Sequence, residues 1–233
     1  LGIYPIGGEQ VAFPMSSSSG TMSAKFDGGA WALRTNYTYA AYFPFSPDYY
    51  NISETELPVS YLGQKQNGDN DLSLLGRYSF MTSTASNPDA AGNVNFTLKQ
   101  VGAWAQLRVV LPEGMNVGKA TLIDNTSDLI VGGTLDLNQD ASSETFVPVL
   151  NNPVYSSSIT LETEEFVAGA DPVKFWLMLP PQNLTGHDLT LVVTSSGGNT
   201  TVEASMTGKE IVRNKPVVFN FGDASNDYKP DYL

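Results

Sequence analysis

Apolar and polar residues alternate with a period of two along most of this chain. In the stretch 93–99, Val94, Phe96 and Leu98 alternate with polar residues, and the stretch 103–111 repeats the pattern. Successive side chains of a β-strand point to opposite faces, so each stretch offers one face to a core and one to solvent. The pattern predicts antiparallel strands. Further strands of this kind are expected at 173–179, 188–194, 201–206 and 216–221.

Turn-forming residues separate these stretches. Gly197 and Gly198 lie between two predicted strands, and glycine readily adopts the positive φ that tight hairpin turns require. A second turn is predicted at 207–210, before the last strand. Strands recur about every 8–15 residues, a spacing typical of β-sandwiches and not of alternating strands and helices. The chain is therefore predicted to be an all-β protein made of two tandem antiparallel β-sandwich domains.

The two predicted domains differ in composition. Residues 16–20 form a short low-complexity segment that we expect to be mobile, whereas 31–45 is rich in aromatic residues. The segment 87–92, which contains Pro88 and Gly92, is the best candidate for a boundary. We therefore expect an N-terminal sandwich over 1–90, with a mobile or cleavable N-terminal segment, and a C-terminal sandwich over 91–233.

The charge of the chain argues against nucleic acid as a partner. The 24 acidic residues outnumber the 12 basic ones, which gives a formal net charge of −12. Phosphate contacts need clustered Lys and Arg, and here the basic residues are scattered along the chain. The same acidic balance predicts repulsion from an anionic membrane surface.

Cysteine chemistry is excluded, because the chain contains no cysteine. It therefore has no disulfide, no thiolate metal ligand and no cysteine nucleophile. No apolar run reaches the about 20 residues that a membrane-spanning helix needs. Because the sequence starts at Leu1 and not at Met, we expect a mature or truncated form from which any signal segment or lipid anchor has been removed.

The sequence offers few groups for catalysis. His187 is the single histidine, and a serine-type triad needs such a base between a nucleophile and an orienting acid. Asp188 is adjacent to it, but neighbouring strand residues face opposite ways. We therefore interpret His187 as a solvated turn residue, and we expect no catalytic site, no bound cofactor and no metal site.

Two acidic segments are candidate sites. If 161–166 is a strand, Glu162 and Glu164 share a face about 6.5–7 Å apart, a separation that glycosidases use. An acidic strand edge that discourages aggregation, including Glu165, explains the same residues more simply. Residues 69–73 begin like a calcium loop, but Phe80 occupies the position where the loop requires Glu, so an ordinary polar turn is expected.

The aromatic segment leaves two interpretations open. Tyr37, Tyr39 and Tyr42, if exposed, could stack on sugar rings and form a glycan platform. Spacing by two is also typical of strand residues that face a core, and buried aromatic residues are common. Core packing is the favoured interpretation.

Several segments together resemble one known family. The stretch 94–109 combines an alternating strand, a short link and a second strand of the form Ala-x-Leu-x-Val. The apolar run 175–179 ends in Pro180 and Pro181, and a closing hairpin and final strand follow over 188–221. Upstream, Trp31 is followed by the aromatic run 39–45. In order and character these elements resemble the fimbrillin-like subunits of anaerobic bacterial fimbriae, although Gln100 stands where that family often has His.

This resemblance implies two transthyretin-like sandwiches in a protein exported to the outer-membrane surface, commonly as a lipoprotein with its anchor at the N-terminus. It implies assembly into a fimbrium with other fimbrial subunits by β-strand addition after proteolytic loss of an N-terminal strand, with host or bacterial surface molecules as further ligands. Lys25 and Arg34 are then the candidate processing residues. The candidate donor-strand or docking residues are Val217, Phe219, Phe221, Tyr228 and Tyr232.

The sequence therefore leaves three candidate functions. A fimbrial structural subunit or adhesin without catalytic activity ranks first. The alternative is a surface carbohydrate-binding lipoprotein that uses exposed aromatic residues. A glycosidase that uses Glu162 or Glu164 ranks third.

Overall fold

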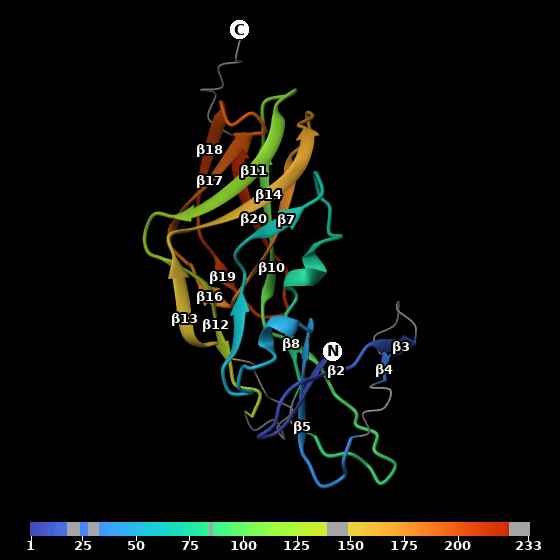
Figure 1. Cartoon of the computed structure of the whole chain (residues 1–233). Coiled ribbons are helices and arrows are strands. Elements are labelled where there is room, and N and C mark those ends of the chain that lie inside the picture. Colours follow the sequence, from blue (N-terminus) through green and yellow to red (C-terminus); the bar gives the residue numbers. More distant parts are fainter. Residues whose placement is uncertain (18–23, 28–32, 84–85, 139–148, 224–233) are drawn as a thin grey trace. The chain divides into compact units, whose positions relative to one another are not determined.

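The computed structural model describes residues 1–17, 24–27, 33–83, 86–138 and 149–223. The regular elements of this described part are strands and the short 3-10 helices η1 (Pro47–Tyr49) and η2 (Leu75–Tyr78). The strands form several sheets, and most of the strand pairs are antiparallel (Figure 1). The prediction of an all-β sandwich fold is confirmed.

The chain divides into two compact units, each built from separate segments. The first unit contains Leu1–Val59, Ser79–Val101 and Gly133–Asn152, and the second contains Ser60–Tyr78, Gly102–Gly132 and Pro153–Leu233. Segments of the two units therefore alternate along the chain. The contiguous division into 1–90 and 91–233 stays a prediction about separately folding domains.

The main sheet of the first unit has the order β2-β1-β5-β8-β9. β1 and β5 pair antiparallel with Ile3 opposite Ala41, and both residues belong to a core cluster that also contains Phe13 and Tyr39. β3 and β4 form a separate two-stranded sheet. The bounds are β1 (Gly2–Pro5), β2 (Val11–Ala12), β3 (Met15–Ser17), β4 (Lys25–Phe26), β5 (Tyr39–Phe43), β8 (Met81–Thr82) and β9 (Lys99–Gln100).

The strand predicted at 93–99 does not form as expected. No strand is assigned over 93–98, and pairing starts only at Lys99, opposite Thr82. The apolar residues of this stretch, Val94, Phe96 and Leu98, are nevertheless half-buried against the core cluster of the first unit. Alternation therefore predicted which side chains face a core. It did not predict the backbone pairing, because side chains can pack against a core without pairing of their own backbone with another strand.

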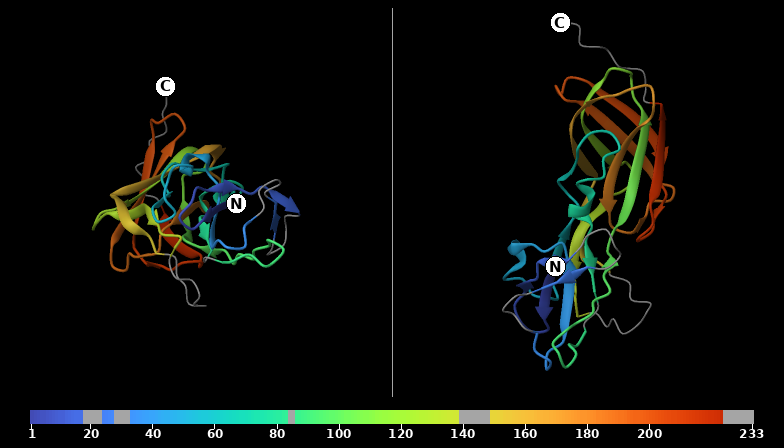
Figure 2. Two further views of the ribbon diagram at one scale, coloured as in Figure 1. Left: turned by 60° about the horizontal axis from the view of Figure 1, so that its bottom comes forward. Right: turned by 90° about the vertical axis from the view of Figure 1, so that its right-hand side faces the viewer.

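The second unit is built mainly from two sheets, of order β18-β17-β11-β14-β7 and β15-β10-β20. In Figure 2 the orange strand β17 can be followed beside the green strand β11. Five predicted strands correspond to β10, β15, β17, β18 and β20. The bounds are β7 (Gln64–Gln66), β10 (Ala103–Val110), β11 (Asn116–Asp124), β14 (Ser158–Val167), β15 (Val173–Leu179), β17 (Asp188–Ser195), β18 (Thr201–Thr207) and β20 (Val217–Asp223).

Alternate residues of β10, β15 and β20 build the core of the second unit. Leu107 lies opposite Phe175 on one side and opposite Phe219 on the other, and all three are 0% exposed. Complete burial of one large apolar side chain stabilises a fold by about 1.5–3 kcal/mol. The intervening residues of these strands lie on the opposite face of the sheet, as the alternation predicted.

Two strand pairs of this unit are parallel, whereas the sequence had predicted antiparallel strands. β20 runs parallel to β10, and β7 runs parallel to β14. Parallel neighbours need a long connection between them, and in both cases the connecting chain contains other strands and passes through a segment of the first unit. The remaining small sheets of the described chain are β13-β12-β6 and β16-β19. Their strands are β6 (Leu57–Ser60), β12 (Leu129–Leu135), β13 (Asn151–Ser156), β16 (Gln182–Asn183) and β19 (Glu210–Ile211).

Candidate functional site

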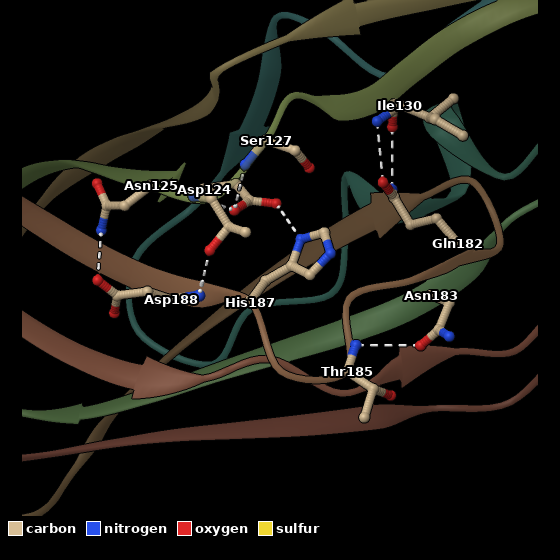
Figure 3. Close-up of polar contacts among 10 residues, drawn as sticks. Asp124, Asn125, Ser127, Ile130, Gln182, Asn183, Thr185, His187 and Asp188 are labelled. Atoms are coloured by element: carbon tan, nitrogen blue, oxygen red, sulfur yellow. Dashed lines mark hydrogen bonds and ion pairs between the residues drawn. The ribbon is translucent and has the colours of Figure 1, made fainter.

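The single histidine is hydrogen-bonded to a buried aspartate (Figure 3). His187 Nδ1 lies 2.7 Å from Asp124 Oδ2, and the side chain of Asp124 is 0% exposed whereas that of His187 is 23% exposed. Asp124 ends β11 and His187 directly precedes β17, so the antiparallel register of these strands brings the two residues together. The position of His187 at a turn is as predicted, since its backbone N–H donates to the Leu184 carbonyl, but its side chain is bonded to a buried carboxylate, which the sequence did not predict. Its partner lies 63 residues away in the sequence, beyond the reach of local pattern.

Backbone N–H groups complete the surroundings of the Asp124 carboxylate. Thr126 and Ser127 donate to Asp124 Oδ1 over 2.9 and 3.2 Å. Burial acts to raise the pKa of Asp124, but the bonds from His187 and from these two N–H groups together hold the pKa below its usual value. The carboxylate is therefore ionised at neutral pH.

Neighbouring polar contacts join the same two segments. The Asn125 side-chain amide donates to Thr190 Oγ1 over 2.8 Å, and the backbone N–H of Asp188 donates to Thr126 Oγ1 over 2.8 Å. These bonds fix the start of β17 against the turn that follows β11.

A side-chain amide anchors the segment before His187 in the same way. The Gln182 side chain accepts from the backbone N–H of Ile130 over 2.9 Å and donates to the Ile130 carbonyl over 3.0 Å (Figure 3). The Asn183 side chain accepts from the backbone N–H of Thr185 over 3.0 Å. Together with the Asp124–His187 bond, these contacts hold the connection between β16 and β17 in place.

This polar cluster lacks the third member that nucleophilic catalysis needs. In the described part of the chain, no hydroxyl group bonds to His187 Nε2. A histidine base must lie within hydrogen-bond reach of the nucleophile that it activates. Among the described residues there is also no group of three or more His, Asp or Glu that could hold a metal ion. The cluster is explained as a structural anchor.

The acidic residues of β14 do not line a single edge. Over Leu161–Thr163, β14 lies between β11 and β7, so the strand is interior at Glu162, whose Cα partner on β11 is Lys119. β7 stops pairing at Thr163, and the exposed residues Glu164 and Glu165 lie beyond that point. The prediction of an acidic edge therefore fails at Glu162, because a segment distant in sequence adds a strand there.

Glutamine side chains of β7 hydrogen-bond to the backbone at the edge of β15. Gln64 accepts from the Met178 N–H over 2.8 Å and donates to the Met178 carbonyl over 2.7 Å. Gln66 accepts from the Trp176 N–H over 2.7 Å and donates to the Lys174 carbonyl over 3.0 Å. A side-chain amide has the same donor and acceptor as a peptide group. The two glutamines therefore take the place that another strand would occupy.

The loop after β7 continues this edge. Asp69 Oδ1 accepts from the Lys174 N–H over 2.8 Å, and the backbone N–H of Asn70 donates to the Lys174 carbonyl over 3.0 Å. Asn70 Oδ1 also accepts from the Trp176 indole N–H over 3.0 Å. The backbone N–H of Ser73 donates to Asp71 over 2.8 Å. The acidic side chains of this loop thus bond to protein N–H groups, in agreement with the predicted polar turn.

The candidate donor segment is an integral strand of the second unit. Phe219 and Phe221 of β20 are 0% and 3% exposed, and Val217 is half-buried. β20 is an edge strand whose neighbour in the sheet is β10. The Lys209 ammonium group donates to the Val218 carbonyl over 3.0 Å. Tyr228 and Tyr232, the other two residues of the prediction, lie outside the described residues.

The candidate processing residues are both exposed. Lys25 belongs to β4, where its Cα partner on β3 is Ser17. Arg34 lies before β5, and its backbone N–H donates to the Tyr39 hydroxyl over 2.8 Å. The low-complexity segment between them and β3 falls mostly outside the described residues, so processing stays a prediction.

The tyrosines considered as a glycan platform do not form one. Tyr37 is 39% exposed, but Tyr39 and Tyr42 are 5% and 1% exposed. The ring of Tyr42 lies 5.8 Å, centroid to centroid, from the rings of both Tyr4 and Tyr49. Burial raises the pKa of Tyr42, and burial together with the Glu54 charge raises the pKa of Tyr4 to about 12. Core packing therefore holds for Tyr39 and Tyr42, whereas Tyr37 is exposed, and the three rings do not form one exposed surface.

A comparison with solved structures finds matches from Bacteroides. One is a candidate cell adhesion protein from Bacteroides uniformis, with a TM-score of 0.52 and 11% identity over 95% of this chain and 84% of that chain. The two proteins share a fold. Candidate cell adhesion proteins from Bacteroides fragilis (TM-score 0.49, 10% identity, 97% of this chain and 80% of that chain) and Bacteroides ovatus (0.46, 16%, 80% and 63%) also match.

Sequence comparisons add no relative. A scan against protein-family models finds no match, and a search of curated sequences finds no significant match. Among the described residues, no helix has the length and apolar character needed to cross a bilayer.

Proposed function

We propose that this protein is a non-catalytic subunit of the bacterial cell surface, a structural fimbrial subunit or adhesin of fimbrillin type. Its partners are other subunits that join it by strand addition at the outer-membrane surface. The all-β fold that it shares with a candidate cell adhesion protein supports this role. The polar cluster around His187 holds a loop, and among the described residues no hydroxyl group bonds to His187 Nε2, which agrees with the proposed role without catalysis.

The assembly proposal rests on which backbone groups at the sheet edges of the second unit are already hydrogen-bonded. Strand addition needs unpaired backbone N–H and C=O groups along an edge. At β15 these groups bond to Gln64, Gln66 and Asp69, and at β20 the Val218 carbonyl accepts from Lys209. The β15 edge is therefore occupied, and we propose that a partner joins this sheet by exchange of a strand that is already present.

β20 is the strand best suited to such an exchange. It pairs with a single strand, β10, and it is the last strand of the described chain. Its alternate residues Phe219 and Phe221 fill the core, while Asn220 is exposed. A segment of this pattern supplies both the backbone bonds and the side chains that a matching groove in a neighbour would accept. In this proposal Val217, Phe219 and Phe221 are the donor residues, and cleavage after Lys25 or Arg34 precedes the exchange.

A disulfide at one register position tests the exchange directly. Ala105 and Val217 are Cα partners in the β10–β20 pair, and the chain has no other cysteine to interfere. Adjacent strands are about 4.8 Å apart, within the reach of a disulfide. In the double variant Ala105→Cys and Val217→Cys, oxidation locks β20 into its own sheet. After limited trypsin treatment, we expect the reduced double variant to form detergent-resistant ladders and the oxidised one to stay monomeric.

A mixing experiment provides the complementary result. Chains with only Ala105→Cys are mixed with isotope-labelled chains that carry only Val217→Cys, treated with trypsin and then oxidised. Strand exchange predicts disulfides between Cys at 105 of one chain and Cys at 217 of the other, identified by mass spectrometry. The variant Lys25→Gln with Arg34→Gln should stay monomeric. Ladders from the oxidised double variant would show that β20 is not the exchanged strand, and wild-type protein that never forms ladders would rule out strand exchange.

A further inference from the structure

The outer face of the sheet β15-β10-β20 carries aromatic and basic residues together. Trp104, Gln106 and Arg108 alternate along β10 with the core residues Ala105 and Leu107, so they lie on the face opposite the core. On β15, Lys174 and Trp176 lie on that same face, because Lys174 is the Cα partner of Arg108 and Trp176 is the partner of Gln106. All of these residues belong to the second unit.

Two tryptophans lie diagonally across the β10–β15 pair. Trp104 is the partner of Met178, two positions from Trp176, and diagonal neighbours on one sheet face are about 7–8 Å apart. Trp104 is 41% exposed, and Trp176 is half-buried with its indole N–H bonded to Asn70 Oδ1 over 3.0 Å. The Trp176 ring is therefore held in one orientation beside an exposed ring.

The two basic residues of this face are unusual for so acidic a chain. Arg108 and Lys174 are directly opposite each other, and like charges in that position destabilise a sheet. In the described part of the chain, neither side chain forms an ion pair with a carboxylate, and the nearby Asp69 carboxylate accepts from the Lys174 backbone N–H. Gln106 Oε1 accepts from Arg108 Nε, which orients the guanidinium group. The pair has the charge complementary to an external carboxylate.

We propose that this face binds an acidic saccharide, with the carboxylate of a uronic acid on Arg108 and Lys174 and the pyranose ring against Trp104. The apolar face of a sugar ring packs on an aromatic ring, and a guanidinium group binds a carboxylate through two parallel hydrogen bonds. The assignment rests on the adhesive role proposed above and names its ligand class. It does not depend on strand exchange.

The strand edges favour a saccharide over an acidic peptide. Extended peptides bind to sheets mainly by backbone pairing at an open edge. Here Gln64, Gln66 and Asp69 occupy the β15 backbone, and Lys209 bonds to the Val218 carbonyl of β20. The β15 edge is therefore occupied by side chains, and a ligand of Arg108 and Lys174 binds through the face of the sheet, where ring stacking and charge are the available contacts.

Calorimetry on the uncleaved monomer tests the assignment, with trigalacturonate as the probe and its methyl ester as the neutral control. We expect wild-type protein to bind trigalacturonate, with affinity that falls as salt rises, and to bind the ester at least tenfold more weakly. Arg108→Gln with Lys174→Gln should weaken binding at least tenfold, and so should Trp104→Ala. The matched control is Lys65→Gln with Lys119→Gln, which removes two exposed basic residues from the other sheet and should leave binding unchanged.

Three results would overturn the assignment. These are no binding of trigalacturonate to the wild-type monomer, equal binding of trigalacturonate by wild type and the Arg108 and Lys174 double variant, and tighter binding of an Asp/Glu hexapeptide than of trigalacturonate by both wild type and Trp104→Ala. The last result would assign the charge pair to an acidic peptide. Because monomeric, uncleaved protein is used, these results are independent of the ladders that test strand exchange.

Discussion

The side-chain amide of Gln64 lies against the backbone of Met178 as a peptide group of a neighbouring strand would, with hydrogen bonds of 2.7 and 2.8 Å. Gln64 is 1% exposed and Met178 is 0% exposed, so neither partner has water as a substitute. β7 therefore joins the two sheets of the second unit, to β14 through its backbone and to β15 through its side chains.

Gln64→Ala is expected to destabilise the protein. The change leaves the Met178 N–H and carbonyl without partners, and each buried unsatisfied group costs about 1–3 kcal/mol. We expect the free energy of unfolding in urea to fall by about 2–5 kcal/mol. Lys65→Ala, one residue away on the exposed side of β7, should change it by less than about 0.5 kcal/mol. Equal effects of the two substitutions would contradict the bridging role of Gln64.

Asp124→Asn is expected to make stability less dependent on pH between pH 2 and 5. The folded-state pKa of Asp124 lies below its ordinary value of 3.8. The ionised Asp124 carboxylate therefore contributes its full stabilisation at pH values above the ordinary pKa. This contribution is lost as the pH falls through the lower folded-state pKa. At neutral pH the variant should lose about 1.5–3 kcal/mol, the strength of a hydrogen bond to a charged group.

The pH prediction is checked by urea unfolding of wild type, Asp124→Asn and Asp128→Asn at a series of pH values. The exposed Asp128 serves as the control. The difference in unfolding free energy between wild type and Asp124→Asn should shrink in acid. A difference that stays constant from pH 7 to pH 2 would show that the ionised carboxylate is not the stabilising group.

Phe219→Ala tests whether β20 belongs to the folded unit in solution. The Phe219 side chain is fully buried between β10 and the core, and a Phe→Ala change in a core costs about 3–5 kcal/mol. Asn220→Ala, on the exposed face of the same strand, should be nearly neutral. Thermal unfolding followed by circular dichroism measures both. A wild-type melting temperature for Phe219→Ala would place β20 outside the core.

Gly208→Ala is expected to disrupt the start of β19, because no side chain fits at this position. A Cβ added to Gly208 would lie 2.3 Å from the Leu184 carbonyl oxygen, so the backbone must shift. At Gly197, in the β17–β18 turn, the nearest atom to an added Cβ is 3.7 Å away on the Asn199 side chain. We expect Gly208→Ala to lower stability by more than about 1 kcal/mol and Gly197→Ala to be tolerated.

The sequence by itself determined which side chains face a core. Alternation located β10, β15, β17, β18 and β20, and it placed the apolar residues of 94–98 correctly even where no strand forms. These are local properties, since the direction of a strand side chain depends on its own backbone and on its neighbours in sequence.

Only the tertiary structure decided which segments lie beside each other. The parallel pairs β10–β20 and β7–β14, the bond from His187 to Asp124 and the bonds from Gln64 to Met178 all join residues distant in sequence. The sequence around a glutamine or an aspartate is the same whether its side chain faces water or the backbone of a remote strand. The burial that makes these polar side chains structural arises only when the sheets pack, which is also what brings Trp104, Arg108 and Lys174 onto one face.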